Sequence, residues 1–168
     1  MGNPQPVSVY GAAFHKLGNR DGLKAAQAYV SAEKTAHDIC DVEDSATALI
    51  RFDNGAVLSV ETAFCLNMKG DRQGVELFGT KGGMRLEPGF ELYSDANGHL
   101  TDTCLAGNPV LDFSRMFQKE IDHYISCVMD STPCRAPAED GVALMKILDA
   151  VYRSAETGHE VVLQTDYK

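Results

Sequence analysis

The stretch that decides the fold is Asp44-Ser-Ala-Thr-Ala-Leu-Ile-Arg-Phe-Asp-Asn-Gly-Ala-Val-Leu-Ser-Val-Glu-Thr-Ala-Phe64. Apolar residues recur at every second position through 46–52 and, with the exception of Thr62, through 56–64, which is the period of a half-buried strand. Between the two runs, Asp53-Asn-Gly55 supplies residues that tolerate a positive φ, as a tight hairpin turn requires. The stretch therefore predicts an antiparallel pair formed by residues 45–52 and 56–64.

Both faces of this predicted hairpin carry apolar residues. Leu49 and Ile50 are neighbours in the chain, so a strand directs them to opposite faces of the sheet. One face would pack against the protein's own core. We expect another domain or another subunit to cover the second face, and we therefore predict self-association through it.

Further strands are predicted before and after the hairpin. Residues 7–17 favour a strand, whereas residues 23–44 are read as an excursion with one helical turn. Short strands are expected at 75–80, 84–87, 90–94, 100–104 and 160–163. Tight turns separate most of them, so neighbouring strands should pair antiparallel.

The pattern changes to helical from Asp112, which is a plausible N-cap. Residues 132–137 break this first helix, and Pro137 suits the first turn of a second helix that Gly158 ends. We expect an α+β fold, with a mostly antiparallel open sheet of six or more strands and both helices packed on one face. Residues 1–168 are predicted to form a single domain.

Composition narrows the class of protein. The chain has 168 residues, a net charge of −9 and 44% hydrophobic residues, which suits a globular domain. The charge and the lack of a basic cluster argue against nucleic acid, and no apolar run is long enough for a membrane span. The first residues do not resemble a signal peptide. The five cysteines form no C-x-x-C pair, so we expect a cytoplasmic protein with reduced thiols.

Four features of the sequence contain residue types that can carry chemistry. His37-Asp-Ile-Cys-Asp41 is interpreted as a solvated loop, and a metal hydrolase built on His37 and Cys40 is the weakest hypothesis. Gly79-Thr-Lys-Gly-Gly83 is interpreted as a β-turn, because a phosphate loop would need a helix after the strand. His123 is read as a surface or core-edge residue, and Cys127 as a small buried hydrophobe. No catalytic or metal-binding residues are assigned.

The loop Asn67-Met-Lys-Gly-Asp-Arg-Gln73 has two interpretations. It carries two cations, two amides and one carboxylate. Such groups can bind the hydroxyls or phosphate of a polar ligand. An exposed polar loop without a binding role has the same composition, and the residues alone leave both interpretations open.

Several stretches, in this order, resemble one family. They are residues 44–64, Val75-Glu-Leu-Phe-Gly-Thr-Lys-Gly-Gly-Met-Arg-Leu86, residues 117–128, and the run from Pro137-Ala-Glu-Asp-Gly to Ala150-Val-Tyr-Arg-Ser-Ala-Glu-Thr-Gly158. Together they resemble the C-terminal domain of the glucose–fructose oxidoreductase/inositol dehydrogenase (Gfo/Idh/MocA) family. The resemblance implies the α+β fold of dihydrodipicolinate-reductase-like C-terminal domains.

The resemblance also implies what precedes such a domain. Family members carry a Rossmann domain that binds NAD or NADP, then a lysine in a Glu-Lys-Pro stretch and a helix with an Asp-x-x-x-His pattern. None of these is found here, so no catalytic or cofactor-binding residue is assigned, and the chain by itself is expected to be inactive. The implied partner is a Rossmann domain in the same protein.

For the chain itself, the resemblance implies substrate-side and assembly roles. The loop 65–73 is similar to a loop that lines the sugar cleft of relatives, so Asn67, Lys69 and Arg72 are the expected substrate-binding residues. The open sheet face is expected to make homo-oligomer contacts. The implied function is the C-terminal domain of an NAD(P)-dependent oxidoreductase acting on a sugar, polyol or related small polar substrate. The alternative is a free-standing binding or assembly domain of the same fold.

Overall fold

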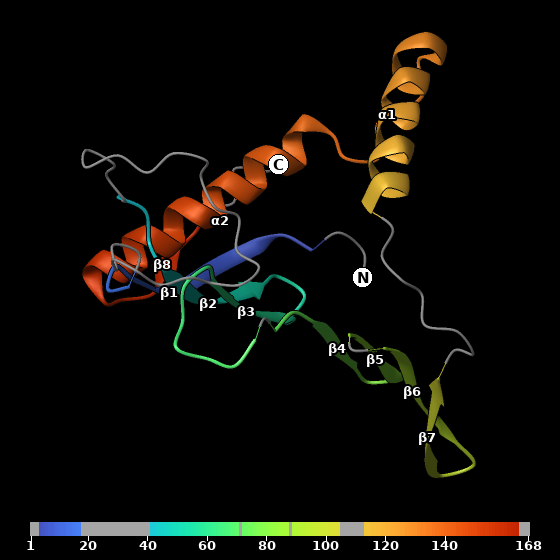
Figure 1. Cartoon of the computed structure of the whole chain (residues 1–168), viewed down its shortest axis with the longest axis horizontal. Coiled ribbons are helices and arrows are strands. Elements are labelled where there is room, and N and C mark those ends of the chain that lie inside the picture. The colour runs from blue at the N-terminus through green and yellow to red at the C-terminus, as the bar shows by residue number, and fades with distance from the viewer. Residues whose placement is uncertain (1–3, 18–40, 71, 88, 105–112, 165–168) are drawn as a thin grey trace. The chain divides into compact units, whose positions relative to one another are not determined.

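The computed structural model describes residues 4–17, 41–70, 72–87, 89–104 and 113–164 (Figure 1). It divides into two compact units, one formed by residues 1–67 and 136–168 and the other by residues 68–135. The predicted turn within 23–44, most of the His37–Asp41 motif and the Asp112 cap lie outside the described residues, and the single-domain organisation stays a prediction.

The first unit contains a four-stranded antiparallel sheet in the order β3-β2-β1-β8. Its strands are β1 (Pro6–Phe14), β2 (Ser45–Phe52), β3 (Val57–Ala63) and β8 (Val161–Val162). The predicted hairpin is confirmed: Ile50 pairs with Leu58, and Gly55 in the connecting turn has a φ of 85°. That φ is the left-handed conformation that glycine adopts without steric cost.

Helix α2 (Ala138–Thr157) packs against this sheet (Figure 1). Its predicted end is confirmed, because Gly158 adopts the left-handed conformation and its N–H donates to the carbonyl oxygen of Ser154 at 2.8 Å. The helix and the sheet enclose a small core, whose buried apolar residues are Val9, Ala48, Ile50, Ala150, Val151 and Val161.

The close approach of α2 to β1 depends on Gly11 and Ser154. A Cβ atom at Gly11 would lie 3.0 Å from the backbone oxygen of Val151, so only glycine fits without movement of the helix. Strand β8 pairs with Ser8 and Val9 only, so it does not reach Gly11. Instead the fully buried Ser154 hydroxyl accepts the Gly11 N–H at 2.9 Å and donates to the His159 carbonyl at 2.7 Å.

The apolar stripe predicted for α2 packs over only part of its length. Val151 is buried as expected, whereas Val142 and Met145 are 53% and 63% exposed. The contact with β1 is formed by the C-terminal half of the helix, where Ala150, Val151 and Ser154 are its buried residues. The N-terminal half therefore presents apolar side chains on the surface of this unit.

The second unit contains another four-stranded antiparallel sheet, in the order β4-β5-β6-β7. Its strands are β4 (Val75–Gly79), β5 (Gly82–Leu86), β6 (Phe90–Ala96) and β7 (His99–Cys104). Thr80 and Lys81 form the turn that we predicted in place of a phosphate loop. The α+β class with antiparallel strands is confirmed, but the strands form two sheets rather than one. Strand pairing stops between β3 and β4, where the polar loop intervenes.

Helix α1 (Phe113–Asp130) confirms the helical pattern predicted from residue 112 onward. Its apolar residues recur every three or four positions, yet Phe117, Tyr124 and Val128 are each more than 60% exposed. Because α1 and α2 belong to different units, their packing on one common sheet face stays a prediction. Neither described helix has the length and apolar character needed to cross a membrane.

Candidate functional site

The loop predicted to bind substrate lies at the boundary between the two units. Asn67 is the last residue of the first unit, whereas Lys69 and Arg72 belong to the second. All three residues are exposed, and Gly70 between them has a φ of 68°. The loop follows β3 and precedes β4, so it is anchored by a sheet at each end. Its substrate-binding role stays a prediction.

One end of the loop is held by contacts with the first unit. Cys65 is half-buried, and its Sγ lies 3.6 Å from the carbonyl oxygen of Leu17. Phe64, just before it, donates its N–H to the carbonyl oxygen of Asp44 at 3.1 Å. The loop therefore leaves the sheet from a position fixed by backbone contacts, while its amide and cationic side chains face solvent.

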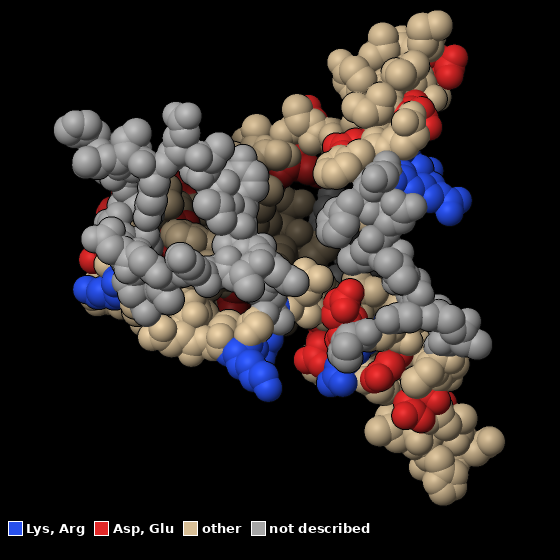
Figure 2. All heavy atoms as spheres, viewed as in Figure 1, with Lys and Arg blue, Asp and Glu red and all other residues tan. Residues whose placement is uncertain are grey.

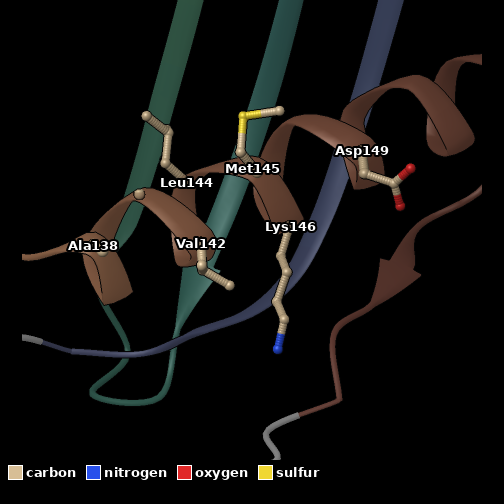
Figure 3. Close-up of a pocket in the computed structure, with 7 residues that line it drawn as sticks. Ala138, Val142, Leu144, Met145, Lys146 and Asp149 are labelled. Atoms are coloured by element: carbon tan, nitrogen blue, oxygen red, sulfur yellow. The ribbon is translucent and has the colours of Figure 1, made fainter.

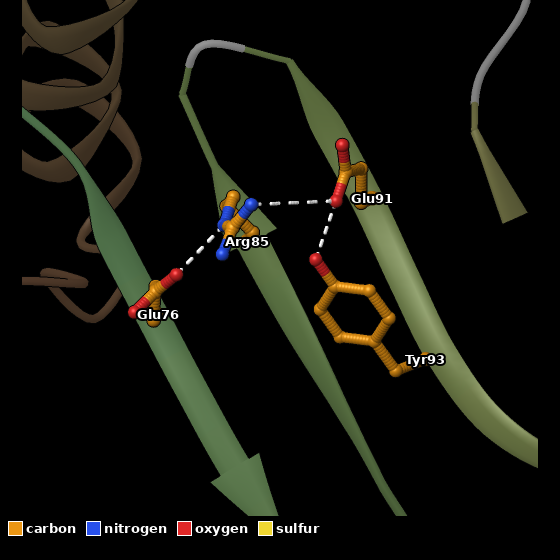
Figure 4. Close-up of polar contacts among 4 residues, drawn as sticks. All are labelled: Glu76, Arg85, Glu91 and Tyr93. Carbon is orange, nitrogen blue, oxygen red and sulfur yellow. Dashed lines mark hydrogen bonds and ion pairs between the residues drawn. The ribbon is translucent and has the colours of Figure 1, made fainter. Parts of the chain in front are cut away.

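A polar ladder crosses the sheet of the second unit (Figure 4). Glu76, Arg85 and Glu91 lie directly opposite one another on three adjacent strands, so they share one face. The Arg85 Nε lies 2.7 Å from Glu76 and a terminal nitrogen lies 3.8 Å from Glu91, which also accepts the hydroxyl of Tyr93. The hydrogen bond to Glu76 raises the pKa of Arg85, and the bond to Glu91 raises the pKa of Tyr93.

This ladder has a structural role in the sheet and is not a good binding site. Its ionic groups bind one another across strands, and the Arg85–Glu76 pair is 42% and 44% exposed. Ion pairs at that exposure contribute little to stability, because water screens them. The ladder also fixes the strand register, because a slip by one residue would move each charge to the other face.

An open groove of about 640 Å³ lies on the N-terminal half of α2 in the first unit (Figure 3). All of its lining residues belong to this one helix, among them Val142, Leu144 and Met145. Most of the lining is apolar, with Lys146 and Asp149 as its charged members. A sugar needs several convergent hydrogen-bonding groups, so this groove does not fit a hydroxyl-rich ligand.

A tyrosine–carboxylate contact joins α2 to the segment before β2. The Tyr152 hydroxyl donates to Oε1 of Glu43 at 2.8 Å. A hydrogen bond from its own backbone N–H and then this tyrosine bond lower the pKa of Glu43. The same contact raises the pKa of Tyr152. The contact holds the carboxylate in its charged form.

Charged side chains are dispersed on the visible face of the described residues (Figure 2). Lys and Arg occur singly or beside acidic groups there, without a continuous basic surface. This distribution agrees with the excess of 24 acidic over 15 basic residues in the chain. The face shown therefore lacks the clustered Lys and Arg side chains that bind the phosphates of nucleic acids.

The structure brings together one set of residues that the sequence interpretation kept apart. Cys127 is half-buried rather than a core hydrophobe, and its Sγ lies 3.5 Å from Nε2 of His123. The spacing of four residues on a helix was the available signal, because such residues share a face. Cys134 lies close to both, which no periodic pattern could indicate.

The fold and the exposed loop define an α+β domain with two antiparallel sheets and an amide-rich and cationic connection between them. Residues 1–163 match the family model described as "Oxidoreductase family, C-terminal alpha/beta domain". The chain belongs to the Gfo/Idh/MocA oxidoreductase family, as its C-terminal domain.

Two curated relatives share this domain. D-glucoside 3-dehydrogenase of Escherichia coli (strain K12) is 31% identical over 164 residues, which is 97% of this chain and 44% of that protein. D-xylose 1-dehydrogenase (NADP(+)) 2 of Haloferax volcanii is 28% identical over 127 residues, or 74% of this chain and 38% of that protein. The chain thus spans less than half the length of these relatives.

The fold itself recurs in solved structures. Levoglucosan dehydrogenase in complex with NADH and L-sorbose matches with a TM-score of 0.72 at 17% identity, over 95% of this chain and 45% of that one. At this identity the match shows the shared fold alone.

Proposed function

We propose that this chain is the substrate-side and assembly domain of an NAD(P)-dependent oxidoreductase that acts on a sugar or polyol. The observation that carries the proposal is the family match over residues 1–163, together with relatives named as a glucoside and a xylose dehydrogenase. In such an enzyme the nicotinamide carries the hydride, and the protein supplies binding and orientation.

The proposed substrate contacts are Asn67, Lys69 and Arg72. Their side chains combine a neutral amide with two cations, so they can donate hydrogen bonds to hydroxyl oxygens or to a carboxylate of an oxidised sugar. Their exposure and their place in the loop that links β3 to β4 support this role, because binding residues are commonly carried by loops.

In this proposal the cofactor binds to a nucleotide-binding domain, which corresponds to the part of the relatives that this chain does not match. Dinucleotide binding of the Rossmann kind needs a glycine turn that opens a helix inside a βαβ unit. Among the described residues, Gly82 and Gly98 lie at strand–strand turns and Gly158 ends a helix. None of these three positions presents a cluster of backbone N–H groups at a helix N-terminus.

Cofactor titration tests whether the cofactor binds outside this chain. The purified chain should show no saturable change in NADH or NADPH fluorescence below millimolar concentration. The same chain joined to a family nucleotide-binding domain should bind one of the two cofactors. A micromolar dissociation constant for the isolated chain would overturn the proposal, and failure of the joined protein to bind either cofactor would favour a binding or assembly domain without a redox role.

Substitutions in the joined protein test the substrate loop. Asn67→Ala and Arg72→Ala should raise KM for the sugar with a smaller effect on kcat, because uniform binding is lost. Lys81→Ala is the matched control, since this lysine lies in the turn between β4 and β5. Unchanged KM and kcat in both loop variants would show that the loop does not contact substrate.

A further inference from the structure

Three side chains that commonly bind metals converge at the C-terminal end of α1. They are His123, Cys127 and Cys134, and their ligand atoms all lie within 4.8 Å of one another. His123 and Cys127 share one face of the helix because four residues separate them. Both cysteines carry thiols rather than a disulfide. All three residues lie within the second unit.

A chain reversal after the helix brings the third residue into place. Helix α1 ends at Asp130, and Ser131 has a φ of 54°, which turns the chain out of its helical path. The backbone N–H of Arg135 then donates to Nε2 of His123 at 3.0 Å. This bond holds the returning segment against the helix, with Cys134 beside the His123–Cys127 pair.

The geometry suits a tetrahedral ion. With Zn–S of about 2.3 Å and Zn–N of about 2.0–2.1 Å, tetrahedral angles place sulfur and nitrogen ligands about 3.5 Å apart. The Cys127 Sγ lies 3.5 Å from Nε2 of His123. Cys134 is exposed and lies outside regular secondary structure, so its Sγ can close on the same centre without a change in the helix.

We propose that His123, Cys127 and Cys134 bind a thiophilic divalent cation of the Zn²⁺ type. Two thiolates balance the charge of the ion, and a sulfur-rich donor set with one imidazole selects zinc over hard cations such as Mg²⁺. Three protein ligands leave a fourth position for water. The bound ion clips residues 131–135 to the last turns of α1.

Metal binding replaces one existing hydrogen bond. The lone pair of Nε2 that accepts the Arg135 N–H is the pair that a metal would use. Coordination therefore releases this N–H, which then lies next to the Cys134 thiolate in the chain and can donate to its sulfur. The site exchanges one hydrogen bond for three metal–ligand bonds.

Cobalt absorption tests this site in the full 168-residue chain. The reduced, metal-depleted protein is titrated with Co²⁺ and then with Zn²⁺ against a chromophoric chelator. One equivalent of Co²⁺ should give thiolate-to-metal charge-transfer bands and the intense visible bands of a tetrahedral ion, and one equivalent of Zn²⁺ should remove them. Octahedral Co²⁺ spectra without charge-transfer bands would overturn the proposal.

Substitutions of the three proposed residues test which of them bind the metal. Cys127→Ser, Cys134→Ser and His123→Ala should each weaken Zn²⁺ binding by more than the roughly 10- to 100-fold that loss of a supporting group around a metal costs. Cys104→Ser and His99→Ala are matched controls on β7 and should bind as the parent chain does. Circular dichroism checks that each variant is folded. Unchanged one-to-one binding in the Cys127→Ser/Cys134→Ser double variant would refute the site.

Discussion

At the scale of single residues, the first unit depends on a few buried polar groups. Ser154 is fully buried, and its hydroxyl bonds to both the Gly11 N–H and the His159 carbonyl. It thereby satisfies a strand N–H that no neighbouring strand reaches. One hydroxyl therefore connects β1, α2 and the segment leading to β8.

Replacement of Ser154 by alanine should destabilise the chain by about 1–3 kcal/mol, because the buried Gly11 N–H loses its acceptor and the His159 carbonyl loses a donor. Urea denaturation followed by circular dichroism measures the change. Thr157→Ala on the same helix is the control, since its hydroxyl bonds only to the exposed Arg153 carbonyl, and it should change stability by less than about 0.5 kcal/mol. Equal effects in the two variants would contradict this assignment.

Tyr152→Phe should raise the pKa of Glu43 part of the way toward its ordinary value, since the backbone hydrogen bond remains. A carboxylate whose pKa is lowered by folding adds stability above its unfolded pKa of about 4.3, and that stability is lost as pH falls through the folded value. The folding stability of the variant should therefore depend less on pH in this acidic window. An NMR titration of the Glu43 carboxyl measures the shift, and Tyr93→Phe in the second unit should leave it unchanged.

At the scale of elements, Asp44 joins the ends of strands. Its side chain is buried, with 3% exposed, and one carboxylate oxygen accepts the backbone N–H groups of Lys16 and Leu17. The Asp44 N–H donates to the carbonyl oxygen of Phe14 at 2.7 Å, and the Asp44 carbonyl oxygen accepts the Phe64 N–H at 3.1 Å. The last residue of β1 and the residue after β3 are thus fastened to one position before β2.

Asp44→Ala should cost about 3 kcal/mol, because two N–H groups lose a charged acceptor in a buried setting. The control is Asp53→Ala, in the exposed hairpin turn, where Oδ1 accepts only the Gln5 N–H at 3.1 Å. That change should cost less than about 1 kcal/mol. Thermal denaturation compares the two variants, and a smaller loss at Asp44 than at Asp53 would show that this buried carboxylate does not hold the strand ends.

At the scale of the whole molecule, the sheet face of the first unit opposite α2 is the feature that bears on assembly. Tyr10 and Leu49 are direct cross-strand partners and are each 50% exposed, on the face opposite the buried Val9 and Ile50. Val57 is 57% exposed and is paired with Arg51, so it lies on the same face. An apolar group of this kind gains about 25 cal/mol per Å² when a partner removes it from water.

We expect the chain to self-associate through this face at high micromolar concentration. Leu49→Glu should shift sedimentation toward the monomer, because the new carboxylates would be desolvated against one another. Leu100→Glu is the control, as Leu100 is 84% exposed on β7 in the other unit. A monomeric parent chain, or equal disruption by both variants, would contradict assembly through the open face.

The strands, the helices and most of their ends could be predicted from the sequence, because they follow from local chemistry. The alternation of apolar residues predicted β2 and β3, and the Asp53-Asn-Gly55 turn predicted their pairing. Gly158 ends α2 because glycine adopts a left-handed conformation without steric cost. The family followed from the order of such stretches, whereas the substrate-binding role of Asn67, Lys69 and Arg72 stays a prediction.

Only the tertiary structure decided which parts of these elements pack together and which side chains meet. The division of the strands into two sheets, the dependence of α2 on Gly11, and the exposure of Val142 and Met145 all depend on where one element approaches another. Cys134 joins His123 and Cys127 through a reversal at Ser131 that no periodicity records. Local patterns determine elements because their causes lie within a few residues, whereas contacts between distant residues arise only when the chain is folded in three dimensions.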